Sequence, residues 1–197
     1  MNADANKQTA AFGWIGIVAV AAFIAMWIAC YAVDGAWEWG VNDLSDFGVS
    51  DTGAASIFNY GCIIVGIVLA IYGIGKVCNY DTYGHKYSGL MIAFSGICFS
   101  MVGVFSTIYG NGDYHHFFAS LTGLFLAAAI VASSAQEWKD GKQIIAGIAI
   151  VIACIVTACM VMYPFAEFEV WALVLAAAWL AIDAGYSIAS SIKGVKQ

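Results

Sequence analysis

Six long apolar segments limit what this chain of 197 residues can fold into. Each is 21 to 23 residues long, and only the last contains a charged residue, Asp183. They lie at 12–33, 53–75, 88–110, 115–135, 144–164 and 170–192. A helix needs about 20 apolar residues to cross the hydrocarbon core of a bilayer. The segments show no alternation of period two, so they predict six transmembrane helices rather than a barrel.

The six segments account for 133 of the 197 residues and leave no room for a soluble domain. We therefore expect residues 1–197 to form a single all-α transmembrane bundle. The composition agrees, since 62% of the residues are hydrophobic and only 10% are charged, whereas a soluble domain is about one quarter charged. This composition excludes a soluble enzyme, a disordered chain and a nucleic-acid binder. Membrane lipids are the expected partners, and the chain acts either alone or as a homo-oligomer.

The lysines predict the orientation of the bundle in a cell membrane. The chain has no Arg, and its seven Lys all fall before the first span, after the last, or in the connections following the second and fourth. Because positive charge stays on the cytoplasmic side, both termini should be cytoplasmic. Eight of the acids fall on the opposite, outer side. No Lys or Arg lies within a predicted span, so we expect no ion pair inside the membrane.

The connections and the small residues predict how the spans pack. The four residues 111–114 make the third and fourth spans antiparallel neighbours. Glycines in the second and third spans predict close helix contacts. The connection 34–52 is the longest and should fold back over the outer mouth of the bundle, with Trp37 and Trp39 at the level of the headgroups. The six Cys are expected to act as packing residues.

Candidate site residues gather on the outer side. We predict catalytic roles for Ser45, Asp46 and one or both of His115 and His116, with Ser45 as a nucleophile or a water activated in its place. Imidazole and carboxylate ligands suit zinc or manganese, so His115, His116 and Asp46 are also candidate metal ligands. Further candidate ligand-binding residues are Asn42, Asn59, Glu167 and Glu169.

A purely structural role is the alternative for several of these acids. The second, fourth and sixth spans begin on the outer side, where Asp51, Asp113 and Glu169 would satisfy the free N–H groups of the helix starts. The neighbours His115 and His116 point about 100° apart on a helix, so only one is expected to face a site.

Asp183 is the intramembrane acid, placed past the midplane towards the cytoplasmic third of the sixth span. Such an acid is a candidate for a proton path by default. The alternative is a hydrogen bond to a Ser or Tyr of a neighbouring helix.

Two short motifs suggest a family. The sequence from Asn42 to Gly48 reads NDLSDFG, Asn59 follows in the second span, and a His opens the fourth. This ordered set resembles the prokaryotic six-span proteins of domain-of-unknown-function family 998, and more distantly the Frag1/DRAM/Sfk1 group, which is associated with lipid handling. The resemblance implies the six-span topology and marks Asn42, Ser45, Asp46, Gly48 and Asn59 as motif positions.

Three functions follow as hypotheses. The first is a lipid-binding or lipid-modifying protein with its polar site at the extracytoplasmic face; if it is an enzyme, it is a membrane-embedded hydrolase, with or without a metal. The second is a small cation or proton-coupled transporter or channel with Asp183 on its path. The third is a membrane subunit without chemistry of its own.

Overall fold

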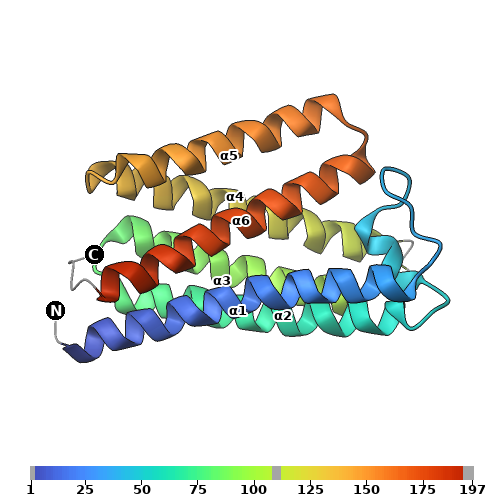
Figure 1. Cartoon of the computed structure of the whole chain (residues 1–197), viewed down its shortest axis with the longest axis horizontal. Coiled ribbons are helices and arrows are strands. Elements are labelled where there is room, and N and C mark those ends of the chain that lie inside the picture. The colour runs from blue at the N-terminus through green and yellow to red at the C-terminus, as the bar shows by residue number, and fades with distance from the viewer. Residues whose placement is uncertain (1–2, 108–111, 193–197) are drawn as a thin grey trace.

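The chain folds into six long helices and one short 3-10 helix, as the computed structural model shows for residues 3–107 and 112–192 (Figure 1). All six long helices have the length and composition to cross a membrane, which confirms the predicted all-α membrane fold. Their bounds are α1 (Ala3–Val33), η1 (Leu44–Val49), α2 (Ala54–Asn79), α3 (Tyr83–Val104), α4 (Asp113–Lys139), α5 (Gln143–Met162) and α6 (Phe165–Ile192).

The six helices form a closed ring. Each packs against its neighbours in sequence, and α1 also packs against α6. The start of α1 and the end of α6 lie at one end of the bundle (Figure 1), where Lys76, Lys86, Lys139 and Lys142 also lie. We call this the inner end and the opposite one the outer end. Lys193, Lys196 and positions 108–111, which include the end of the predicted third span, lie outside the described residues.

Small residues bring the backbones of α2 and α3 together. A β-carbon at Gly66 would meet the carbonyl oxygen of Gly96, and one at Gly73 would meet that of Gly89. The prediction of close contacts is therefore confirmed for this pair of helices. Gly61 and Gly75 serve a different contact, since a β-carbon there would meet Met26 and Phe12 of α1.

The connection 34–52 covers the outer mouth of the bundle, as predicted. Phe47 is fully buried, and Leu44 and Trp37 join it in an apolar cluster with residues of α1, α2 and α6. The Trp37 indole stacks on Phe47 and donates a hydrogen bond to the Asp43 carbonyl oxygen. Trp37 is therefore packed inside the covering loop, which also satisfies its N–H. Trp39 is exposed.

The helices extend past several predicted span ends. At the inner end α2 continues to Asn79 and so includes Lys76, α3 begins early enough to include His85, and α4 continues past Glu137. The charge-free segments therefore mark only the most apolar part of each helix. All six Cys are free; Cys78 and Cys154 are exposed and the other four are buried, which suits the packing role for those four.

Candidate functional site

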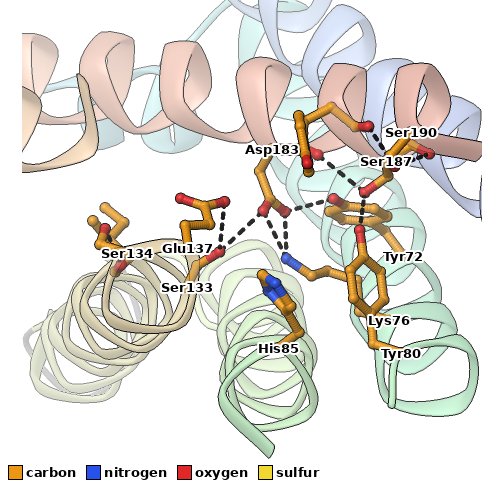
Figure 2. A network of polar contacts seen from close by, with 12 residues as sticks. Tyr72, Lys76, Tyr80, His85, Ser133, Ser134, Glu137, Asp183, Ser187 and Ser190 are labelled. Carbon is orange, nitrogen blue, oxygen red and sulfur yellow. Dashed lines mark hydrogen bonds and ion pairs between the residues drawn. The ribbon is translucent and has the colours of Figure 1, made fainter. Parts of the chain in front are cut away.

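Asp183 lies at the centre of a buried polar cluster at the inner end of the bundle (Figure 2). It is 5% exposed. Lys76 places its ammonium group 2.7 Å from both carboxylate oxygens of Asp183, and the Tyr72 hydroxyl donates a hydrogen bond of 2.6 Å to Oδ2. The predicted contact with a Tyr of a neighbouring helix is thus confirmed, and an ion pair accompanies it.

The expectation of no ion pair inside the bundle is wrong. Lys76 is 1% exposed and lies one turn after Tyr72 on α2, so both side chains reach Asp183 from the same helix face. The ammonium remains buried because Asp183 supplies a matching charge, whereas a lone charge in an apolar interior is strongly destabilising. The predicted second span ends at residue 75, one residue before Lys76. From the sequence alone, Lys76 is therefore expected in the connection that follows the span.

A second carboxylate, Glu137, belongs to the same cluster. Ser133 on α4 places its hydroxyl 3.3 Å from Oδ1 of Asp183 and 3.4 Å from Oε1 of Glu137. A hydroxyl has a single proton, so Ser133 donates to only one of the two carboxylates at a time. Glu137 is 2% exposed, and no lysine among the described residues forms an ion pair with it as Lys76 does with Asp183.

Tyr80 and Ser187 close the cluster on the side of α6. Their hydroxyl oxygens are 2.6 Å apart, and Ser187 also donates to the backbone carbonyl of Asp183. Burial raises the pKa of Tyr80 above its usual value, and the negative charge of Asp183 adds to this effect. Tyr80 therefore stays neutral and retains its hydroxyl proton for hydrogen bonding.

Charges at the end of α4 connect the cluster to the inner surface. Oδ2 of Asp140 is 3.6 Å from Nε2 of His85 and 3.6 Å from the ammonium group of Lys142. The Lys142 ammonium also lies 4.8 Å from the centre of the Tyr186 ring, a cation–π contact. The buried cluster thus continues into a group whose Asp140 side chain is 23% exposed.

Among the described residues, this region holds three acids against two lysines. The acids are Glu137, Asp140 and Asp183, and the lysines are Lys76 and Lys142. With His85 neutral, the ionised groups sum to one negative charge. One additional proton, on a carboxyl group or on the imidazole, makes the group neutral. The arrangement is thus able to hold one exchangeable proton within a largely apolar bundle.

Sequence reasoning found Asp183 and its neighbour Ser187, and missed the partners that come from α2 and α4. A signal was present, because polar residues recur every fourth position near the inner ends of three spans. This spacing holds for Tyr72 and Lys76 on α2 with Tyr80 directly after it, for Ser133 with Glu137, and for Asp183 with Ser187. Residues four apart lie on one face of a helix, and such polar columns in separate apolar segments indicate a shared interior site.

The predicted outer residues mostly hold the covering loop in place. Asp46 accepts hydrogen bonds from the backbone N–H of Asp43 and from the Asn42 side chain. Asn59 donates to the Gly48 carbonyl oxygen at 2.9 Å, which joins the two parts of the sequence motif. Ser45 is buried within η1.

The two acids at the start of α6 contact the same loop. Glu169 accepts a hydrogen bond of 2.7 Å from the backbone N–H of Leu44, so it stabilises the loop rather than the start of its own helix. Glu167 approaches Gly40 so closely that a β-carbon there would lie 3.0 Å from Oε1. Gly40 also has a φ of 75°, a conformation that favours glycine.

The side chains of His115 and His116 point in different directions, as expected for two consecutive residues of a helix. His115 is buried, and its Nδ1 donates to the Phe105 carbonyl oxygen at 3.0 Å. His116 is exposed, and it lies near enough to Asp43 for its charge to oppose the rise in the pKa of that acid. Among residues 3–107 and 112–192, no three His, Cys, Asp or Glu side chains are placed to hold a metal ion, so His115, His116 and Asp46 are not brought together as a ligand set.

The other two predicted helix caps, at Asp51 and Asp113, also differ from the structure. The Ala54 N–H at the start of α2 is satisfied by the Thr52 hydroxyl and not by Asp51, because Gly53 is the N-cap residue. Asp113 lies in the first turn of α4. The negative charge of Asp113 there lies near the positive end of the helix dipole. The start of α4 has no side-chain cap hydrogen bond.

Comparison with known proteins assigns a family and no activity. A family model described as "Protein of unknown function (DUF998)" matches residues 17–185, well over half of the chain. No curated protein and no solved structure gives a significant match.

Proposed function

We propose that this chain, which belongs to the DUF998 family of membrane proteins of unknown function, moves protons across the membrane. The observation that carries this proposal is the group formed by Lys76, Asp183 and Glu137 inside the helix ring. Ionisable residues within spans are rare, and they typically mark ion pathways and proton relays.

The charges favour a proton over a larger ion. Lys76 occupies both oxygens of Asp183, so the carboxylate of this pair is already neutralised. Among the described residues Glu137 is the other buried acid, and a single proton is the smallest species that removes its charge. Ser133 lies between the two carboxylates. When a proton arrives or leaves, its hydroxyl can rotate and donate to the other carboxylate.

The apolar packing above the cluster makes transport depend on a conformational change. Tyr72, Trp179 and Leu180 belong to an apolar cluster that fills the ring beside Asp183. A second apolar cluster lies beneath the covering loop. The side chains of the ring therefore close the route from Asp183 to the outer end, and a proton crosses only when helices move apart there.

Proton flux in liposomes tests this proposal. Purified protein is reconstituted with a pH-sensitive dye inside, and a potassium diffusion potential drives proton entry. We expect wild-type protein to carry protons, and Glu137→Gln and Asp183→Asn to fall to the rate of empty liposomes. Asp51→Asn, which alters an exposed outer acid, is the matched control and keeps the wild-type rate. Wild-type flux equal to that of empty liposomes, or full flux in Glu137→Gln, overturns the proposal.

A lipid site at the outer face is a second proposal. Asp43 and His116 come from separate elements and lie close enough for their charges to interact, which leaves a polar pair near the outer end. If this site retains a lipid, Asp46→Ala should lose it, since Asp46 holds Asn42 and Asp43 in position. Mass spectrometry of co-purified lipids is the measurement, and identical lipids in both proteins contradict it.

A further inference from the structure

Three polar residues on one face of α3 have buried atoms without hydrogen-bond partners. They are Thr82, His85 and Ser88, spaced three apart, so they lie along one side of the helix start. Within the described part of the chain, no group accepts from or donates to Thr82 Oγ1, either ring nitrogen of His85, or Ser88 Oγ. Buried polar atoms are nearly always satisfied, and water satisfies those that protein groups do not reach.

His85 lies next to the ammonium group of Lys76, on the side away from Asp183 (Figure 2). It is 2% exposed, and its ring centre is 4.8 Å from that of Tyr80. The charged or titratable groups that face it are Lys76 and Tyr80 from the α2 side, Asp183 from α6, and Asp140 and Lys142 from the end of α4. It is therefore surrounded by Lys76, Lys142, Asp140 and Asp183 of the charged group described above.

The distance from His85 to Asp140 fits a relay through water. Nε2 is 3.6 Å from Oδ2 of Asp140, which is too long for a direct hydrogen bond. A water molecule commonly bridges polar groups at such separations. Nδ1 is the second free nitrogen of the ring, and it is also buried without a partner. A histidine that keeps both nitrogens free of protein contacts is suited to accept a proton at one and release it from the other.

We propose that His85 transfers protons between the inner surface and the buried carboxylates, so that in this conformation the site exchanges protons with the inner side. The inference rests on the proposed proton transport. A proton reaches Nε2 from the Asp140 side and forms an imidazolium. The Nδ1 proton then passes through water to Glu137 or Asp183. The ring returns to its neutral form, one carboxylate becomes a carboxylic acid, and no other group changes charge.

The liposome assay with added imidazole tests the role of His85. Replacing a group that transfers protons costs about 100-fold or more in rate. We expect such a loss of flux in His85→Ala, with partial recovery when imidazole is added to the side that exposes the inner end. His85→Gln keeps a polar side chain of similar size but carries no proton, and it should lose flux without rescue. Tyr83→Phe alters an exposed side chain at the start of the same helix and should behave as wild type.

The outcomes separate this inference from the proposal on which it rests. If the wild-type protein carries protons and His85→Ala carries them at the same rate, the relay is overturned and the proposal of proton transport stands. A loss in His85→Ala that imidazole does not restore assigns a structural role to His85 and also overturns the relay. Absence of flux in the wild-type protein overturns the proton transport itself. We expect the elution volume and the thermal stability of His85→Gln to equal those of the wild type. A change in either value would identify a variant that has failed to fold.

Discussion

At the scale of single residues, the contact between Lys76 and Asp183 joins two helices through opposite charges that are both removed from solvent. Removing one partner leaves the other charge buried and unpaired, which costs about 3–5 kcal/mol. We expect Lys76→Met to lower the free energy of unfolding by about this amount, as measured from tryptophan fluorescence during heating in detergent.

The double variant Lys76→Met, Asp183→Leu should recover most of that loss, because neither charge then remains. Replacement of a buried pair by apolar residues is often neutral or stabilising. Lys139→Met, at an exposed position of the same end, is the control and should unfold like the wild type. A Lys76→Met protein as stable as wild type would show that Asp183 does not depend on this lysine.

Asp43 gives the covering loop a dependence on pH. Burial raises the pKa of Asp43, and the nearby Asp46 raises it further. The folded state therefore binds this proton more tightly than the unfolded chain, and ionised Asp43 destabilises the fold at neutral pH. We expect Asp43→Asn to be more stable than wild type at about pH 7 and equally stable below about pH 4, where Asp is protonated in both states.

Thermal unfolding across this range measures the effect. Asp51→Asn is the control, since Asp51 is an exposed acid of the same connection. Parallel curves for wild type and Asp43→Asn at all pH values would contradict the prediction.

At the scale of helices, the contact between α2 and α3 depends on the absence of side chains. A β-carbon at Gly66 would meet the Gly96 carbonyl oxygen and the Ser100 hydroxyl, and such overpacking costs about 1–3 kcal/mol. We therefore expect Gly66→Ala to lower the unfolding temperature. Gly123→Ala on α4 meets no atom within 4 Å, so it should be neutral or stabilising by up to about 1 kcal/mol. Equal unfolding temperatures for the two variants would contradict the tight contact.

The existence of the helices followed from the sequence, but their ends did not. A charge-free segment long enough to cross a bilayer has few other structures available, so α1 through α6 were predictable. The inner ends were misjudged because a charged residue such as Lys76 or Glu137 was taken to end a span. A helix continues through a charged residue when a neighbouring helix supplies a group of opposite charge or a hydrogen bond. Counting uncharged residues along one segment does not take that neighbouring helix into account.

At the scale of the whole molecule, the start of α1 and the end of α6 lie at the same end of the bundle (Figure 1). The positive-inside rule assigns that end to the cytoplasm. In a chain whose other cysteines are replaced by Ser, we expect the exposed Cys78 to resist a membrane-impermeant maleimide applied to intact cells. Asp51→Cys in a background that also lacks Cys78 should react, and inside-out vesicles should reverse the pattern. Labelling of Cys78 from outside would invert the topology.

The candidate site was predictable only in part, because it arises from residues far apart in sequence. Asp183 stands out as a lone acid in an apolar segment, and its depth was visible from the helix rise. Its cation precedes it by 107 residues, and nothing in the spacing of a single chain reveals that the side chains of Lys76 on α2 and Asp183 on α6 meet inside the ring. The outer motif was visible, but its hydrogen bonds to Gly48 and Leu44 give it a structural role that residue types alone did not reveal.

The separation of Lys76 from Asp183 also bears on how the protein is made. During synthesis α2 enters the bilayer with an ammonium group whose counter-ion does not yet exist, and three more helices follow before α6 supplies it. Until then the lysine side chain must extend towards the headgroups to keep its charge in water. Arrival of α6 draws it inward and closes the ring against α1. The last helix is therefore the one that completes assembly, and a chain cut short before it would present an unpaired charge to the quality control of the membrane.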